Sequence, residues 1–503
     1  MIGPRWIGRR RRYDDVTSYQ LAALVGERPT TTRPLQRSVS KPARERYAPR
    51  LGWKQPYAGR AASAARPAVF RADTSQLPGL YPFLHAQSLP PMGAYIGWNT
   101  LSMQSFSAHP ALWVVAGLVT NPNVLVTGIP GAGKSANVKA LSLRLMPFGV
   151  RTLIAGDVKG EYTPLCRALG VEPVRLGPGM SGRLNPLDAG PLGRDLPRDS
   201  DEHRAREVEI QRRRMTLVTA LLERQLRRRP RQDEMASVAL AIRQVTGELD
   251  AASSLRNPTM PLVYEALRDP SGSMTQELRI RNRDAQLLRE QTADVREALG
   301  AMVHGHLGGL FDQESSQVLD FDAPIQSVDI SGMGSYGEET IAMVLTCVSS
   351  WAQAAIDRPG PPRLVVRDEI WRQMRSGGSA MVGKIDADLR LSRAQGTIQV
   401  LATHRLSDFE AVGATGSEAS NIARELISSC ETRIQLAQDT APLQMTREVI
   451  GLTDAECALI SSWGKTHVGR ALWKVGRTGS HPVQLRLSSR ERALFYTDER
   501  MAG

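Results

Sequence analysis

The stretch G-I-P-G-A-G-K-S (128–135) fits the pattern G-x-x-x-x-G-K-[ST]. An apolar segment, N-V-L-V-T-G (123–128), precedes it, and Val138, Leu141 and Leu145 follow at helical spacing. A strand, a glycine-rich turn and a helix in this order present backbone N–H groups at a helix N-terminus, where they bind phosphate. The pattern predicts a phosphate-binding loop made of Gly128, Ile129, Pro130, Gly131, Ala132, Gly133, Lys134 and Ser135.

Such a loop is typical of sites that bind ATP with Mg²⁺. Lys134 would reach the β- and γ-phosphates, and Ser135 would be a ligand of the metal. A second, acidic ligand is expected at a strand end, and R-L-V-V-R-D-E (363–369) supplies one. We expect Asp368 to hold the metal and Glu369 to act as general base on the attacking water.

Arg367 departs from this pattern, because a buried strand position there should be apolar. Either Arg367 pairs with an acidic residue, or the strand leaves one face partly open. The sequence does not choose between these two interpretations.

Strands alternate with helices along the chain, which predicts an α/β fold with a mostly parallel sheet covered on both faces. We divide the chain into a basic, largely disordered arm (1–75), a first part of the core (76–195), a helical insertion (196–310) and a second part of the core (311–503). Strands are expected at 93–99, 123–128, 151–157, 170–177, 318–322, 325–331, 363–369, 397–404, 431–436, 470–476 and 482–488.

The charge is concentrated at the N-terminus. Residues 1–72 hold 14 Arg and 2 Lys against four acidic residues, a net charge of +12, out of +13 for all 503 residues. Such an arm is either a solvated or assembly segment, or it binds nucleic acid or an anionic membrane surface. No secretory signal and no apolar run of about 18 residues occur, so we expect a cytoplasmic protein without a transmembrane span.

Several motifs together resemble the FtsK–HerA superfamily of P-loop motors, and within it the type IV secretion and conjugation ATPases of the VirB/TraC type. The aspartate–glutamate pair is followed by Trp371, as in the family's D-E-x-W box. The other motifs are D-V-K-G-E-Y (157–162), R-L-N-P-L-D (183–188), G-G-L-F-D (308–312) with V-D-I-S-G (328–332), and A-T-H-R-L-S-D (402–408).

The resemblance implies a RecA-like core and further site residues. Arg393 lies 11 residues before His404, which is the family's spacing between a trans-acting arginine and a γ-phosphate sensor. His404 stands where the family has glutamine, and Arg433 is a second, less favoured arginine finger. The resemblance also implies a homo-oligomer, expected to be a hexamer, which meets type IV secretion channel proteins at the inner face of the membrane.

Three functions remain open. The leading one is an ATP-hydrolysing motor that powers conjugative DNA transfer or type IV secretion. The second is a DNA translocase or coupling protein of the FtsK–HerA type that acts directly on DNA, which the basic arm favours. The third is a nucleotide-binding assembly scaffold with little turnover. The load, the ring size and the channel partners are not fixed by the sequence.

Overall fold

The computed structural model describes most of the chain from Leu89 to Tyr496. The described residues are 56, 89–177, 182–188, 200–249, 257–277, 285–305, 309–315, 320, 322–334, 336–357, 360–410, 418–464, 467–476 and 479–496. The chain divides into two units, Met1–Ala86 and Gln87–Gly503, and the sheet and helices belong to the second. The predicted arm (1–75) lies outside the described residues except for Pro56, as do three residues of the expected strand 318–322.

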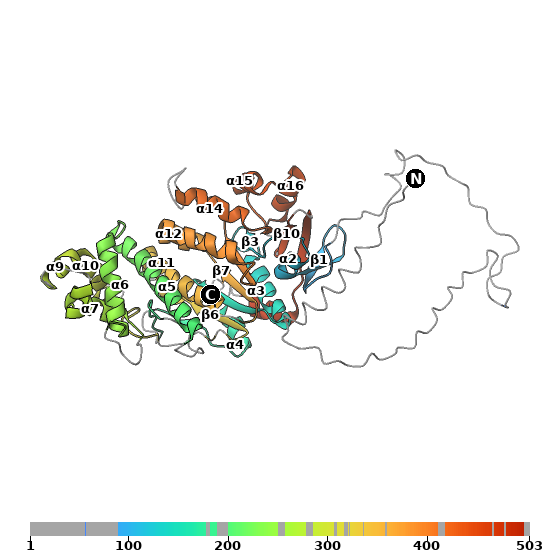
Figure 1. The fold of residues 1–503 in the computed structure, drawn as a ribbon. Coiled ribbons are helices and arrows are strands. Elements are labelled where there is room, and N and C mark those ends of the chain that lie inside the picture. Colours follow the sequence, from blue (N-terminus) through green and yellow to red (C-terminus); the bar gives the residue numbers. More distant parts are fainter. Residues whose placement is uncertain are drawn as a thin grey trace, which may run out of the picture. The chain divides into compact units, whose positions relative to one another are not determined.

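A sheet of eleven strands forms the core of the second unit (Figure 1). Its order is β2-β1-β11-β10-β9-β3-β8-β7-β4-β6-β5. The seven strands from β9 to β5 are parallel, and the other four join antiparallel at one edge. The strands are β1 (Ala94–Asn99), β2 (Ser105–Ala108), β3 (Val124–Thr127), β4 (Arg151–Asp157), β5 (Val174–Arg175), β6 (Ile325–Asp329), β7 (Arg363–Arg367), β8 (Thr397–Thr403), β9 (Thr432–Gln435), β10 (Arg470–Val475) and β11 (Ser480–Leu485). The predicted mostly parallel α/β sheet is confirmed.

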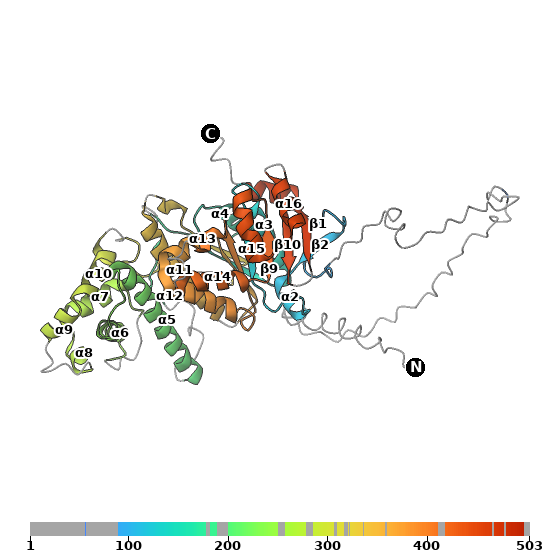
Figure 2. The ribbon, with the colours of Figure 1, turned by 90° about the horizontal axis from the view of Figure 1, so that it is seen from above.

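The direction of each crossover fixes which face its helix covers, because parallel crossovers are right-handed. From β3 to β4 to β5 the chain steps one way along the sheet, so α3 (Lys134–Leu145) and α4 (Thr163–Ala168) cover one face. From β6 to β7 to β8 to β9 it steps back. This brings α11 (Glu338–Asp357), α12 (Ile370–Leu391) and α14 (Glu418–Ser428) side by side onto the other face (Figure 2).

Shorter helices complete this unit around the sheet. They are α2 (Pro110–Val115), α13 (Ser407–Glu410), α15 (Thr440–Ile450), α16 (Asp454–Trp463) and α17 (Ser489–Phe495). Among the helices in the described ranges, none is both long enough and apolar enough to cross a membrane.

In its described residues, the predicted helical insertion has six helices and no strand. They are α5 (Asp201–Leu226), α6 (Gln232–Thr246), α7 (Met260–Arg268), α8 (Gly272–Glu277), α9 (Ala285–Gln291) and α10 (Ala293–His304). Their buried side chains, such as Leu222, Val238 and Leu299, share one apolar core with Val344 and Cys347 of α11. The insertion is therefore joined to the α/β core through the helices on one face of the sheet.

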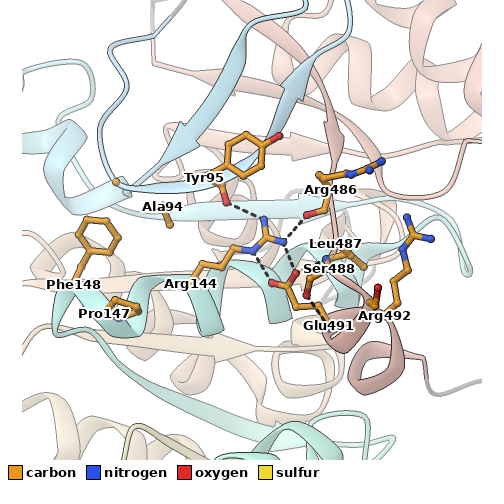
Figure 3. Close-up of a pocket in the computed structure, with 12 residues that line it drawn as sticks. Ala94, Tyr95, Arg144, Pro147, Phe148, Arg486, Leu487, Ser488, Glu491 and Arg492 are labelled. Atoms are coloured by element: carbon orange, nitrogen blue, oxygen red, sulfur yellow. Dashed lines mark hydrogen bonds and ion pairs between the residues drawn. The ribbon is translucent and has the colours of Figure 1, made fainter.

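A surface pocket of about 870 Å³ lies between β1, the end of α3 and α17 (Figure 3). The guanidinium of Arg144 donates two hydrogen bonds to the carboxylate of Glu491, at 2.7 and 2.8 Å, and others to the carbonyls of Tyr95 and Arg486. These bonds tie α17 and the first strand to the last turn of α3. The pocket lies about 15 Å along α3 from the glycine-rich loop, so it is separate from the N-terminal end of that helix.

Candidate active site

The predicted motifs meet at one edge of the sheet, because parallel strands present their carboxyl ends to the same side. The glycine-rich loop follows β3, and His404 follows β8. Asp368 and Glu369 follow β7, and the D-V-K-G-E-Y segment (157–162) begins at the last residue of β4. The order β3-β8-β7-β4 makes these four strands neighbours. The topology thus brings together segments that lie up to about 270 residues apart in sequence.

The glycine-rich loop turns sharply into α3. Gly133 has φ +98°, and a Cβ atom there would lie 2.8 Å from the backbone nitrogen of Gly469, so only glycine fits. Lys134 is the first residue of α3, and its Nζ donates to the carbonyl of Gly128 at 2.9 Å. Burial lowers the pKa of Lys134 to about 8, although the nearby carboxylates oppose this shift. The lysine therefore lies folded back along its own loop, in a buried position.

Glu369 lies at the centre of the site and is held by three donors. Its Oε1 accepts from Nζ of Lys159 at 2.9 Å and from Nε2 of His404 at 2.7 Å, and its Oε2 accepts from the indole of Trp371 at 2.8 Å. The backbone of Glu369 has φ +50°, in the left-handed region that non-glycine residues seldom adopt. A strained backbone at a charged residue is typical of functional sites.

The two acids differ in their electrostatic surroundings. Burial acts to raise the pKa of Glu369, but the hydrogen bonds and charges of His404 and Lys159 outweigh it, and the pKa lies well below its ordinary value. Burial, together with the charges of Glu369 and Glu161, raises the pKa of Asp368 to about 6. Glu369 is therefore firmly ionised, whereas a cation beside Asp368 would be needed to keep that carboxyl ionised to the same degree.

His404 connects the phosphate-binding lysine with Glu369. Its Nδ1 lies 2.6 Å from Nζ of Lys134, and its Nε2 lies 2.7 Å from Oε1 of Glu369. A protonated lysine can only donate, so Nδ1 accepts and Nε2 carries the hydrogen that goes to the carboxylate. Glutamine also offers one acceptor and one donor group. The imidazole can therefore make the two bonds that glutamine would make at this position.

Arg367 is fully buried and pairs with an acidic residue. Its Nη2 lies 2.8 Å from Oδ2 of Asp388 on α12, and its Nη1 donates to Oγ of Ser349 on α11. Of the two interpretations left open by the sequence, the first therefore holds. The strand is closed on both faces, and the pair fixes the end of β7 to two helices.

The structure does not bring Arg393 to this site. Arg393 is exposed in the turn between α12 and β8, where its guanidinium donates to the carbonyl of Thr120 at 3.4 Å. It precedes β8, whereas His404 follows it, and seven strand residues span about 20 Å. Arg433 donates to the carbonyls of Cys430 and Ile450. Any role of Arg393 would have to be on another subunit.

The sequence assigned no role to Lys159 or Trp371, although both contact Glu369. Both residues lie in motifs that indicate only the family resemblance and assign no role to a single residue. A signal was nevertheless present, because Lys159 is one of only eight lysines and follows a strand whose carboxyl end lies at the site edge. Tyr162, in the same segment, points its hydroxyl toward Oδ2 of Asp368 at 3.5 Å.

The donor set fits Mg²⁺ bound together with a nucleotide. In the described part of the chain, no three His, Cys, Asp or Glu side chains form a cluster that could hold a metal by themselves. Mg²⁺ is usually bound by one or two protein oxygens together with substrate phosphates and water. Ser135 at the start of α3 and Asp368 at the end of β7 provide such oxygens at the same edge of the sheet.

Comparison with solved structures supports the assignment of the fold. VirB4 of Thermoanaerobacter pseudethanolicus matches with a TM-score of 0.61 and 18% identity, covering 81% of this chain and 100% of that chain. The bacterial conjugative coupling protein TrwB, without its first 70 residues, matches with a TM-score of 0.49 and 13% identity over 79% of this chain and 89% of that one. No protein-family profile and no curated protein matches the sequence. The chain therefore shares its RecA-like α/β fold with VirB4.

Proposed function

We propose that this protein is an ATP-hydrolysing motor. One observation carries the proposal: Lys134 of the phosphate-binding loop, His404 and Glu369 form a continuous hydrogen-bonded chain, with contacts of 2.6 and 2.7 Å. This chain connects the group that binds the terminal phosphates with the group that activates water. A loop that only binds nucleotide would not need an ionised carboxylate at this place.

Each residue has a role that follows from its place. The backbone N–H groups of Gly131–Ser135 cradle the phosphates, and Lys134 leaves the carbonyl of Gly128 to neutralise the β- and γ-oxygens. Ser135 and Asp368 would hold Mg²⁺, which neutralises charge on the phosphates when bound. Glu369 accepts the proton of the attacking water. His404 keeps the carboxylate oriented and senses the γ-phosphate through Lys134.

Arg393 is proposed to act on the nucleotide of a neighbouring subunit. Arg393 is exposed at the start of β8, about 20 Å from the described site residues that follow the other end of that strand. We therefore propose a homo-oligomer, expected to be a hexamer, in which each subunit supplies this arginine to the next.

The proposed work of the motor is conjugative DNA transfer or type IV secretion, at the cytoplasmic face of the membrane with channel proteins as partners. The VirB4-like fold, which spans 81% of the chain, supports this role. A DNA translocase acting directly on DNA is the second candidate, and the charge of +12 on residues 1–72 favours it. Two departures favoured a passive scaffold, Arg367 and His404. His404 contacts Glu369 in the site, and Arg367 forms a buried structural pair with Asp388, so neither argues against an active site.

The test compares two variants in ATP hydrolysis and in ATP binding. Lys134→Ala should abolish hydrolysis and weaken binding, since the phosphates lose their charged partner. Glu369→Gln should abolish hydrolysis but retain ATP, because only the water-activating group is lost. Hydrolysis by Glu369→Gln at the parental rate would show that another group is the base. Hydrolysis that survives Lys134→Ala would show that the activity does not belong to this site.

A further inference from the structure

The segment D-V-K-G-E-Y (157–162) forms a fixed turn beside the acidic pair. The carboxylate of Asp157 accepts hydrogen bonds from the backbone nitrogens of Glu161 and Tyr162, at 3.0 and 2.8 Å. Gly160 has φ +69°, and a Cβ atom there would lie 3.0 Å from Oγ of Ser331. The turn is therefore closed by its own first residue and packed against the next strand end. Its geometry directs Lys159 at Glu369.

The donors around Glu369 occupy some, but not all, of the hydrogen-bond acceptor positions of its carboxylate. Each carboxylate oxygen can accept about two hydrogen bonds in the plane of the group. Oε1 already accepts from Lys159 and from His404, so it is saturated. Oε2 accepts only from Trp371 among the contacts in the described structure, and one acceptor position remains. A general base needs one free lone pair on a carboxylate that cannot rotate.

We propose that Lys159 is a positioning residue for the proposed ATP hydrolysis: it saturates and immobilises Oε1 of Glu369, so that the free lone pair of Oε2 faces the attacking water. This inference rests on the proposed function. Lys159 touches the base and acts through it. His404 is hydrogen-bonded to Lys134, which is proposed to move when phosphate binds, whereas Lys159 stands on a turn outside the glycine-rich loop. It can therefore hold the base throughout the cycle.

The first experiment measures steady-state ATP hydrolysis by the full chain. Lys159→Ala should lower kcat about ten-fold, a part of the 10²–10⁴-fold that a general base contributes. KM for ATP should change little, because the phosphate-binding loop keeps all its groups. Lys159→Arg should recover most of the loss, because it keeps a charged donor at this place. Lys474→Ala is the matched control, since it removes a lysine bound to Glu456 and the carbonyl of Gly451, outside the site.

The outcomes separate this inference from the proposed function. Parental kcat in Lys159→Ala would overturn the inference, and so would a raised KM at unchanged kcat, which would make Lys159 a phosphate ligand. Failure of the proposed function would appear elsewhere, as hydrolysis that survives Lys134→Ala. A crystal structure of Lys159→Ala gives a readout that needs no turnover: the carboxylate of Glu369 should leave its place between His404 and Trp371. An unmoved carboxylate would also overturn the inference. Thermal unfolding checks the fold, which should persist because the side chain of Lys159 is half exposed.

Discussion

Replacing Asp388 with alanine should strongly destabilise the protein, because it leaves the charge of Arg367 buried without an acidic partner. Arg367 has no exposed surface and Asp388 is about 5% exposed, and their atoms lie 2.8 Å apart. Burial lowers the pKa of Arg367, and the charge of Asp388 opposes that shift. Removing one partner of such a pair typically costs about 3–5 kcal/mol, much more than the pair contributes over a well-packed apolar replacement.

Urea unfolding followed by circular dichroism measures this loss, with a double variant and a control. Arg367→Leu combined with Asp388→Leu removes both charges and should recover most of the stability lost in Asp388→Ala. Asp386→Ala is the control on the same helix, because Asp386 pairs with the exposed Arg390. The loss of stability in Asp386→Ala should be much smaller, since solvent screens the pair of Asp386 and Arg390.

Two results would refute this reasoning. If Asp388→Ala lowers the free energy of unfolding no more than Asp386→Ala does, the buried pair contributes no more to stability than the exposed pair. If the double variant is as unstable as Asp388→Ala alone, then lost packing rather than an unpaired charge explains the effect. Either result would leave the arginine in the central strand β7 without an electrostatic explanation.

Three further predictions concern the motor. Mixing Arg393→Ala subunits with Lys134→Ala subunits should restore some ATP hydrolysis, because each supplies what its neighbour lacks; the absence of rescue at every mixing ratio would count against a trans-acting arginine. His404→Gln should keep most of kcat, since an amide can still accept from Lys134 and donate to Glu369, whereas His404→Leu should lose at least ten-fold; equal rates for the two would show that the bridge has no role. Deleting residues 1–72, which carry +12, should weaken binding to DNA or anionic vesicles and flatten its salt dependence while ATP hydrolysis persists; binding that is unaltered at two salt concentrations would contradict the electrostatic role of the arm.

The sequence predicted best where local signals agree. Apolar periodicity and the glycine-rich loop place the helix at 134–145, and the structure has α3 over the same residues. The sequence predicted strands least well where their pairing partners are distant along the chain. Of the strand expected at 170–177, only Val174 and Arg175 pair with β6. The edge strand β2 is four residues long and was not predicted. The start of α2 did have a signal, with His109 as N-cap and Pro110 in the first turn.

The candidate site could be predicted up to the point where strand order matters. The expectation of an acidic residue at a strand end predicted that Lys134, Asp368 and Glu369 lie together, and the structure brings them to one edge of the sheet. That β4 lies next to β7, and hence that Lys159 reaches Glu369, follows from tertiary structure and not from spacing in the sequence. The partner of Arg367 was hidden for the same reason, because Asp388 lies about five helical turns along α12.

The strained backbone of Glu369 explains how one dipeptide serves two roles. Its φ of +50° reverses the chain from β7 into α12 within a single residue. The carboxylate of Asp368 accepts from the backbone nitrogen of Glu369 at 3.0 Å and faces Tyr162, while Glu369 turns toward Lys159 and His404. Glycine would relieve a strain of about 1–3 kcal/mol but would have no carboxylate. The left-handed turn points the two consecutive acids in different directions, as their proposed roles, Asp368 toward Mg²⁺ and Glu369 toward the attacking water, require.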